Sequence, residues 1–553
     1  MNGRSVDALI VGAGPVGLTM AAALTRHGLV CRIVDKAPAP TDKSKALVVW
    51  CRTLELLDQL DLARTFVEAG HPISGGSMYA DGQRLVHLAL TSGDSPYGFP
   101  LMIPQSETER LLAEHLARRG VTVERQVELT SLDAGPDGVA CALRHLDGRE
   151  ESCRAPWLIG CDGAHSAVRH ALGIPFTGEA EPNDWMLADV HVEGPLAADE
   201  VSIFWHASGV LAFFPITRDR FRMIADIGVS TDGANRPDPT LADAQARADE
   251  RGPGGLTLTH PVWLANFRIN ERKVQDYRRG RVMLAGDAAH IHSPAGGQGM
   301  NTGMQDAFNL GWKLALVQRG LGQAEPLLQS YSAERSAVGD QVLQNAARFT
   351  TLATLKSPAA QWMRNHLAPI AGSFQFVRDR IRDEWLELSI NYRHSPLSTE
   401  HWPARAGGPA AGDRLPDAPL TAPDGRQTTL FAAIRGGRST VPSPPRHALL
   451  LLPGVGDAGR TSALLDVAAG ASRNFPDAVS AHLIAPAGAA APRADTSALA
   501  RWVDADGRAH RTLGATNRAL LLVRPDGYVG YRGQPADSDA LAAHMDRYLV
   551  RAR

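Results

Sequence analysis

The sequence predicts an α/β fold organised around a Rossmann-like dinucleotide-binding domain. Three observations support this fold class: a glycine-rich strand–helix–strand pattern near the start, two later strands that each run into a turn with glycine and aspartate, and a strand-rich middle segment. Alternating strands and helices are typical of a parallel sheet, whereas a separate strand-rich stretch indicates a second sheet. More than one domain is therefore expected.

Composition is typical of a globular protein. The 553 residues are 44% hydrophobic, and 57 Lys and Arg residues against 59 Asp and Glu residues give a formal net charge of −2. This balance argues against nucleic acid or an anionic membrane as a partner. No apolar run approaches the ~18 residues of a membrane-spanning helix. Five cysteines without a C-x-x-C pair favour a reduced, cytoplasmic protein.

The first element is a βαβ unit in residues 6–35. We expect a buried strand over 8–11, a helix over 15–27 and a second strand over 30–34. Gly12, Gly14 and Gly17 have the G-x-G-x-x-G spacing, which allows a tight turn, a close approach to a pyrophosphate and close helix packing. Asp35 ends the second strand, where a carboxylate can bind an adenosine ribose. A secretory signal is disfavoured because Asp7, the glycines and a proline interrupt the apolar run.

Two further segments repeat the theme of a strand followed by glycine and aspartate. The first has a predicted strand over 157–161, a turn at Asp162 and Gly163, and a short helix over 164–172; a helix cap is an alternative role for Asp162. The second has a strand over 282–285, then Gly286 and Asp287, a glycine-rich loop and a helix over about 302–317. Asp287 is placed to bind a polyol chain, and the positive end of that helix can face an electron-rich ligand edge.

His290 and His292 in the same loop also suggest a metal site. Two histidines in a His-x-His pattern can supply two ligands, but no carboxylate or cysteine stands at a supporting spacing. We therefore expect no metal.

Together these motifs resemble the class A flavoprotein monooxygenases of the p-hydroxybenzoate hydroxylase fold. The resemblance is carried, over residues 6–395, by GAGPVG with Asp35, GCDGAHSAVR and GDAAHIHSPAGGQGMNTGMQDAFNLGWKL. Near the C-terminus, LELSINYRHSPLS and RALLLVRPDGYVGYRG resemble the subgroup with an added thioredoxin-like domain, which includes phenol hydroxylase and aromatic polyketide hydroxylases. A domain of this kind without cysteine cannot exchange dithiols, so a packing or dimer-forming role is expected for it.

The resemblance implies FAD as the cofactor and NADPH or NADH as the co-substrate. Residues implied to bind FAD are Gly12, Gly14, Pro15, Val16, Gly17, Asp35, Lys36, Lys45, Gln105, Val127, Asp162, Gly163, Gly286, Asp287, Pro294, Gly297, Gly299, Met300 and Asn301. Asp162 and Arg169 are implied for NAD(P)H. Lys45 stands where the family has arginine, and lysine lacks the planar fork of arginine for bidentate contacts.

The strand-rich segment over about 184–280 is expected to cover the flavin and to bind substrate. Candidate members of an aromatic pocket wall are Trp205, His206, Phe213, Phe214 and Pro215, although alternating aromatic residues in a sheet are also typical of core. The predicted domains are an FAD-binding domain (1–180 and 281–395, ending in a helical segment), a β-rich substrate domain (181–280), a linker (396–412) and a thioredoxin-like domain (413–553).

The implied activity is hydroxylation of a small phenolic or polyketide-type aromatic substrate with O2, through a hydroperoxide at flavin C4a. The sequence identifies no catalytic base, substrate or position of hydroxylation, and it leaves a homodimer open. Alternatives are oxidative inactivation of an antibiotic, a flavin-dependent halogenase or reductase, and a nonenzymatic flavin-binding scaffold. The halogenase is disfavoured because its Trp-x-Trp-x-Ile-Pro signature is absent.

Overall fold

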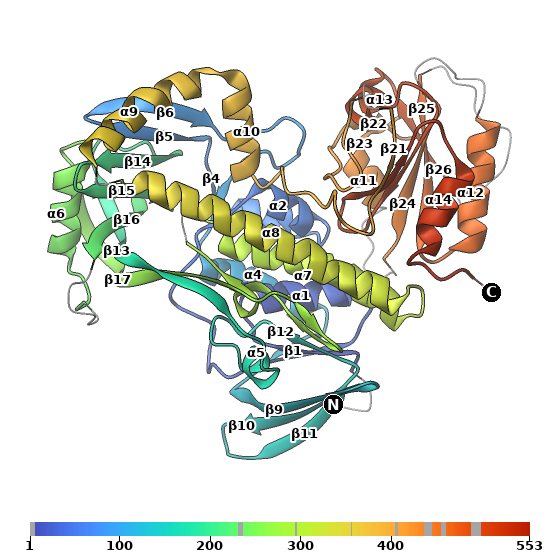
Figure 1. The fold of residues 1–553 in the computed structure, drawn as a ribbon, viewed down its shortest axis with the longest axis horizontal. Helices are drawn as coiled ribbons and strands as arrows, with labels where there is room; N and C mark the ends of the chain where they lie inside the picture. The colour runs from blue at the N-terminus through green and yellow to red at the C-terminus, as the bar shows by residue number, and fades with distance from the viewer. Residues whose placement is uncertain are drawn as a thin grey trace.

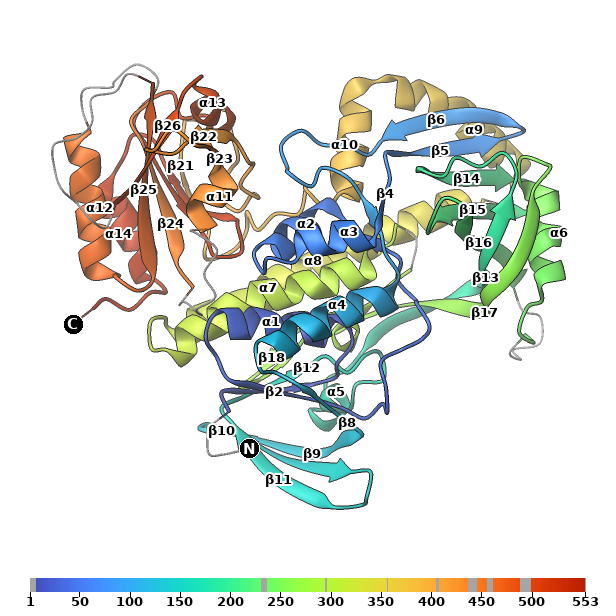
Figure 2. The same ribbon diagram turned by 180° about the vertical axis from the view of Figure 1, so that it is seen from behind.

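The structure is a computed structural model that describes residues 6–229, 236–293, 296–355, 357–403, 407–435, 445–454, 461–487 and 499–552. Figure 1 shows three regions: a central α/β region, a sheet with its covering helices at one end, and a separate α/β region at the C-terminus. Figure 2 shows the same arrangement from behind, with α1, α4 and α7 side by side over the central sheet.

The central sheet has six strands in the order β18-β19-β12-β1-β2-β8, and β19, β12, β1, β2 and β8 run parallel. The four residues of β1 are all buried, as a strand covered on both faces requires. The strands are β1 (Ala8–Val11), β2 (Cys31–Asp35), β8 (Val123–Arg125), β12 (Trp157–Gly160), β18 (Arg278–Arg279) and β19 (Val282–Leu284).

Helices α1 and α7 pack on each other above this sheet, and α4 packs on α1. The helices of this region are α1 (Pro15–Arg26), α2 (Cys51–Asp58), α3 (Ala63–Ala69), α4 (Gln105–Arg118), α5 (Ala167–Ala171), α7 (Gly299–Gln318) and α8 (Ala324–Ala353). Two three-stranded sheets adjoin them: β9 (Val127–Gly135), β10 (Gly138–His145) and β11 (Glu150–Ala155), and β3 (Val48–Val49), β4 (His71–Pro72) and β7 (Leu101–Met102).

The predicted strand-rich segment forms most of an eight-stranded sheet in the order β20-β17-β13-β16-β15-β14-β5-β6. Helix α6 covers its outer face, and α9 and α10 lie beside β5 and β6 (Figure 1). The strands are β5 (Gly75–Ala80), β6 (Gln83–Ala89), β13 (Thr177–Glu193), β14 (Glu200–His206), β15 (Gly209–Pro215), β16 (Arg220–Val229), β17 (Thr257–Lys273) and β20 (His290–Ile291), and the helices are α6 (Leu241–Arg251), α9 (Pro358–Ser373) and α10 (Gln375–Trp385). The sequence did not predict that β5 and β6 join this sheet.

The C-terminal region has another eight-stranded sheet, in the order β21-β28-β27-β24-β25-β26-β22-β23. Its strands are β21 (Thr399–His401), β22 (Pro419–Thr421), β23 (Gln427–Thr429), β24 (His447–Leu452), β25 (Val479–Pro486), β26 (Leu499–Asp504), β27 (Ala519–Val523) and β28 (Val529–Gly533), and its helices are α11 (Leu430–Arg435), α12 (Ser462–Asn474), α13 (Arg508–Leu513) and α14 (Ser538–Asp546). Strands β27 and β28 pair antiparallel and form a hairpin. A thioredoxin-like identity for this region stays a prediction.

Buried charges join the C-terminal region to the central one. Glu334 of α8 accepts hydrogen bonds from both terminal nitrogens of Arg524, at 2.7 and 2.9 Å, and from Lys313 of α7 at 2.7 Å. All three side chains are almost inaccessible to solvent. Because an unpaired charge at this depth is costly, these ion pairs hold the two regions in one arrangement.

The local predictions near the glycine turns are close to the structure, with shifts at helix ends. Helix α7, predicted to begin near 302, begins at Gly299. The amide N–H groups in the first turn of a helix need no acceptor within the helix, so this turn tolerates Gly299 and Met300. The short helix begins at Ala167, since Ser166 caps it by accepting the Arg169 amide N–H at 2.9 Å. None of the described helices is both long and apolar enough to cross a membrane.

Candidate active site

The three glycine-containing turns meet at one edge of the central sheet. They follow β1, β12 and β19, which are adjacent and parallel, so their carboxyl ends lie together. A Cβ on Gly12 would lie 2.3 Å from the carbonyl oxygen of Cys161, and a Cβ on Gly286 would lie 2.7 Å from Cγ2 of Val16. The segment that contains Gly12 and Val16 is thus in contact with both of the other turns. Both contacts require glycine, at Gly12 in the first turn and at Gly286 in the third.

Two glycines at this edge face open space. Apart from the adjoining residues, no protein atom lies within 4 Å of the Cβ position of Gly14 or of Gly163. Gly14 directly precedes α1, whose amide groups at the N-terminus favour a bound phosphate. The space therefore fits a pyrophosphate lying against the backbone of the first turn.

Asp35 ties the first turn to the end of β2. Its two carboxylate oxygens accept the amide N–H groups of Ala13 at 2.6 Å and Ala37 at 2.7 Å, and Arg125 lies 3.6 Å away. Each oxygen keeps a further lone pair. A ribose hydroxyl is therefore compatible with the position of Asp35.

Asp287 is exposed at the turn that follows β19. Its side chain is accessible to solvent, yet the surrounding protein desolvates the carboxyl group and raises its pKa, while positive charge on His290 and Lys45 opposes the rise. A group that is both reachable and desolvated suits a polar ligand that replaces water. Lys45, which is also exposed, supplies the nearby cation that an anionic cofactor requires.

Asp162 has an unsatisfied acceptor in the second turn. One carboxylate oxygen accepts the Val168 amide N–H at 3.1 Å, as the cap alternative requires, whereas the other is buried without a partner among the described residues. A buried acceptor that lacks a donor is costly. A ligand hydroxyl or amide at this edge would satisfy it.

Several other predicted cofactor residues have their side chains engaged by the protein. Asn301 accepts the Trp50 amide N–H at 2.9 Å and donates to the carbonyls of Val48 and Gly297. The Gln105 amide bridges the Ala46 amide N–H and the Glu109 carboxylate. For both residues a direct side-chain contact with FAD therefore stays a prediction, and their observed role is to shape the loops.

The remaining predicted cofactor residues have varied surroundings. Lys36 is exposed, Pro15, Gly299 and Met300 are half-buried, and Val127 is buried at the start of β9. Gly297 has a left-handed φ of +62°, and its Cβ would clash with Val48 at 2.4 Å, so packing also explains this glycine. Pro294 lies outside the described residues.

Arg169, predicted for NAD(P)H, is buried and serves the protein interior. Its guanidinium donates to the carbonyls of Ala288 at 3.1 Å and Ala164 at 2.8 Å, and it lies over the Phe176 ring at 4.0 Å. It joins the second turn to the third. A direct contact with the nicotinamide cofactor is not evident from this arrangement.

The sheet prediction needs one correction. Trp205, Phe214 and Pro215 are buried or half-buried. Trp205 and Phe214 belong to the same apolar cluster as Trp50 and Val48, on the face of the sheet opposite α6, which we call the inner face. We call the edge of the central sheet where the three glycine-containing turns meet the cofactor edge. Phe213 is fully buried on the outer face against α6, because side chains alternate along a strand. Phe213 is therefore not part of the same wall. His206 is exposed at the end of β14.

Sequence reasoning missed Arg222 and Asp189 of this sheet. Both are buried, and Arg222 donates from Nε and Nη2 to the two carboxylate oxygens of Asp189, each at 2.8 Å. Its Nη1 donates to the Lys45 carbonyl at 3.0 Å. An arginine in a strand carries no local signal of such a long-range contact.

The two histidines of the third segment are engaged separately. His290 is 3.0 Å from the Asp306 carboxylate, whereas His292 Nδ1 lies 2.9 Å from the Ser293 carbonyl and must donate to it. Burial, together with His290, lowers the pKa of His292 to about 4. Among the described residues, no group of three or more His, Cys, Asp or Glu side chains is arranged to hold a metal ion.

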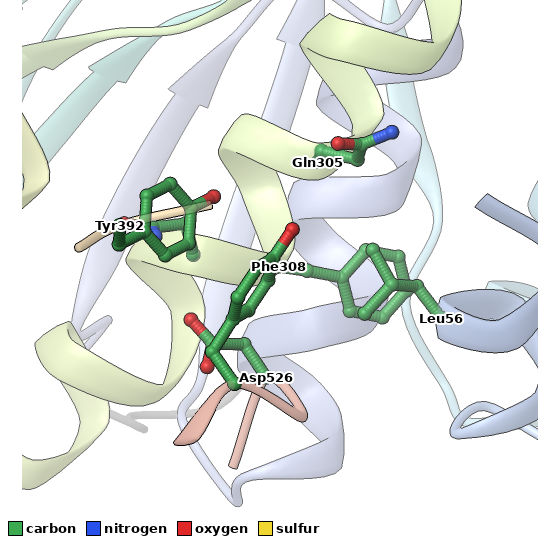
Figure 3. Close-up of a pocket in the computed structure, with 7 residues that line it drawn as sticks. Leu56, Gln305, Phe308, Tyr392 and Asp526 are labelled. Atoms are coloured by element: carbon green, nitrogen blue, oxygen red, sulfur yellow. The ribbon is translucent and has the colours of Figure 1, made fainter. Parts of the chain in front are cut away.

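A gap behind α7 is separate from the cofactor edge. Figure 3 shows Leu56, Gln305, Phe308, Tyr392 and Asp526 around it, and Asn309 and Tyr528 complete its lining. It has no room for a water-sized molecule. We therefore do not regard it as a ligand site.

The open glycines, the unsatisfied Asp162 oxygen and the exposed but desolvated Asp287 carboxyl group fit a dinucleotide that crosses all three turns. Residues 5–346 match the sequence family described as "FAD binding domain". The chain belongs to this FAD-binding family. Its relatives and structural neighbours are class A flavin monooxygenases, so the protein is an FAD-dependent monooxygenase.

Two relatives of this flavin monooxygenase match it over nearly its full length. It is 36% identical to 6-methylpretetramide 4-monooxygenase from Streptomyces rimosus, covering 97% of this chain and 92% of the relative. It is 32% identical to pentachlorophenol 4-monooxygenase from Sphingobium chlorophenolicum, covering 99% and 98%. The structure of the anhydrotetracycline hydroxylase from Streptomyces rimosus has a TM-score of 0.73 at 29% identity and covers 99% of both chains. The resemblance seen in the sequence is confirmed.

Proposed function

We propose that this flavin monooxygenase hydroxylates a phenolic ring of a polycyclic, polyketide-type substrate, with NADPH or NADH as reductant. The observation that carries the proposal is the 36% identity, over 97% of the chain, to an enzyme named for oxidation of 6-methylpretetramide. Bound FAD supplies the redox chemistry, because it accepts electrons from a nicotinamide and activates O2.

The residues of the chain have three roles in this proposal. The first is cofactor binding at the three glycine turns, with Asp35 toward the ribose and Asp287 toward the sugar-alcohol chain. The second is exclusion of water: Trp50, Trp205 and Phe214 form an apolar cluster beside the cofactor edge. A dry site prolongs the life of an activated oxygen species.

The third role is substrate selection. An inner face rich in aromatic side chains favours a flat, apolar substrate, which can stack on these rings. A simple phenol, such as the one named for the relative from Sphingobium, is the smaller alternative within the same reaction class.

Flavin reduction measured without oxygen tests the proposal. The purified holoenzyme is mixed with NADPH or NADH in a stopped-flow instrument, alone and with a tetracyclic phenol, a monocyclic phenol or a nonphenolic antibiotic. We expect the tetracyclic phenol to accelerate flavin bleaching most. In a separate turnover experiment under ¹⁸O2, mass spectrometry should show one ¹⁸O atom added to this phenol. Flavin reduction that is unaffected by every phenol would contradict aromatic hydroxylation. Labelling of the antibiotic alone would indicate antibiotic inactivation instead.

A further inference from the structure

The Lys45 carbonyl accepts a hydrogen bond from the eight-stranded sheet that contains β13 and β16. We call it the substrate sheet because it is expected to cover the substrate. Arg222 of β16 donates Nη1 to this carbonyl at 3.0 Å, across 177 positions of sequence. Arg222 is only 2% exposed, so the donor of this partly buried hydrogen bond lies in the protein interior. The loop that carries Lys45 is therefore fixed by the sheet expected to cover the substrate.

The neighbours of Lys45 are held by the first turn of α4. The hydroxyl of Ser44 lies 3.1 Å from that of Ser106, and the Ala46 amide N–H donates to Gln105 Oε1 at 3.2 Å. Three consecutive residues thus have separate contacts, through the Ser44 hydroxyl and the backbone of Lys45 and Ala46, while residue 45 stays exposed. The loop presents a free ammonium group from a fixed backbone.

Arg222 is itself fixed by Asp189. The two residues are register partners on β16 and β13, and the guanidinium forms a bidentate pair with the carboxylate at 2.8 Å for both contacts. A bidentate arginine has a defined orientation, which a lysine cannot reproduce. Its remaining terminal nitrogen is therefore aimed at the Lys45 carbonyl.

The positive charge of Lys45 acts on Asp287 of the third turn. This positive charge lowers the pKa of the Asp287 carboxyl group, against the larger rise that desolvation causes. Lysine in place of the family arginine lacks a fork of its own, so its effect depends on how its backbone is placed.

We propose that Arg222, oriented by Asp189, is a positioning residue that fixes Lys45 against the anionic part of the cofactor and so links the substrate sheet to cofactor binding. This inference rests on the proposed role of Lys45 in the cofactor site. It assigns no chemical step to Arg222, which acts through Lys45.

A double-mutant cycle on FAD affinity tests the link. Apoprotein of the wild type, R222M, K45A and the R222M/K45A double variant is titrated with FAD, and flavin fluorescence gives the dissociation constant. We expect each single variant to weaken FAD binding about tenfold, as loss of one charge-assisted contact does. The double variant should also bind FAD about tenfold more weakly than the wild type, and no more weakly than either single variant, because both changes remove the same interaction.

The controls separate a positioning role from a structural one. R220M removes a neighbouring arginine that lies 3.8 Å from Asp189 and, among the described residues, forms no hydrogen bond with Lys45, so it should leave FAD affinity unchanged. If R222M does not fold, R222K takes its place in the cycle, with circular dichroism confirming the fold. A roughly hundredfold loss in the double variant, or full affinity in R222M, overturns the inference. Full affinity in K45A overturns both the inference and the role of Lys45 but leaves FAD binding standing, whereas a wild type that binds no FAD contradicts the proposed function itself.

Discussion

Val16 of the first turn occupies the space beside Gly303 of α7, where a Cβ atom would lie 2.6 Å from its Cγ2 and 3.0 Å from the Cα of Gly286. This contact joins the first and third cofactor turns through one side chain. The backbone of Gly286 cannot move aside cheaply, since it follows a buried parallel strand. Gly303 therefore sets the distance between two parts of the cofactor edge.

We predict that Gly303→Ala lowers the free energy of unfolding by about 1–3 kcal/mol, as overpacking of a tight interior does. It should also weaken FAD binding, since Val16 must shift. Gly470→Ala in α12 is the matched control: no atom lies within 4 Å of its Cβ position, and the change should stabilise the protein by about 0.5–1 kcal/mol. Chemical denaturation and FAD titration of both variants give the result. Equal behaviour of the two would contradict the tight contact.

Asp287→Asn should have opposite effects on FAD binding and on stability. Because desolvation raises the pKa of this carboxyl group in the folded protein, the folded state binds more protons, and stability falls as pH rises through the unfolded pKa toward the folded one. The asparagine removes this cost, so the apoprotein should melt at a higher temperature than the wild type at pH 7. The difference should vanish at a pH below the unfolded pKa.

In the same variant FAD binding should weaken about tenfold or more, since a hydrogen bond to a charged group is lost. A melting curve of the apoprotein from pH 3 to 8, together with an FAD titration at pH 7, measures both effects. Unchanged FAD affinity in Asp287→Asn would place Asp287 outside the cofactor site.

Phe213 and Phe214 offer a matched pair for the substrate wall. Phe214→Ala changes the inner face and should raise the KM for an aromatic substrate several-fold with a small loss of stability. Phe213→Ala leaves a cavity in the outer core against α6 and should cost about 3–5 kcal/mol of stability. Steady-state kinetics and denaturation compare the two. A larger KM effect from Phe213→Ala would reverse the assignment of the faces.

Glu334→Gln tests the join between the central and C-terminal regions. Arg524 and Lys313 hold the pKa of this buried carboxyl group well below its usual range despite desolvation, so the pair stabilises the protein above the unfolded pKa and is lost as pH falls. Removing one partner should cost about 3–5 kcal/mol at pH 7.

Glu325→Gln is the control on the same helix. Its side chain is 77% exposed and pairs with Arg278, so its loss should cost less than about 1 kcal/mol. Denaturation at pH 7 compares the two variants. A Glu334→Gln protein as stable as Glu325→Gln would show that the buried pair does not join the regions.

The local signals in the sequence were sufficient to predict the three glycine-containing turns. They did not predict the contacts from other elements that hold these turns and the Lys45 loop in place. The spacing of Gly12, Gly14 and Gly17 and the position of Asp287 follow from backbone geometry within a few residues, and the strand order then brings them together. The contact of Arg222 with Lys45 depends on long-range packing of a second sheet. Neither periodicity nor residue type distinguishes the buried Arg222 from Arg218, which is exposed, or Arg220, which is half-buried.

The inner and outer faces of the substrate sheet show the same limit. Alternation predicts that Phe213 and Phe214 point in opposite directions, but the aromatic residues alone do not tell which face meets the cofactor. The structure decides this through Trp50, which belongs to the same cluster as Phe214 and donates its indole N–H to the carbonyls of Gly296 and Gly297.

Titration of the apoprotein with FAD, with one variant in each of the three turns, tests the central claim most directly. The account predicts one FAD per chain with a flavin absorption band, and weaker binding in variants at Gly14, Asp162 and Asp287 alike. A wild type that stays colourless after reconstitution, or variants in any one turn that keep full affinity, would contradict a single cofactor held by all three turns.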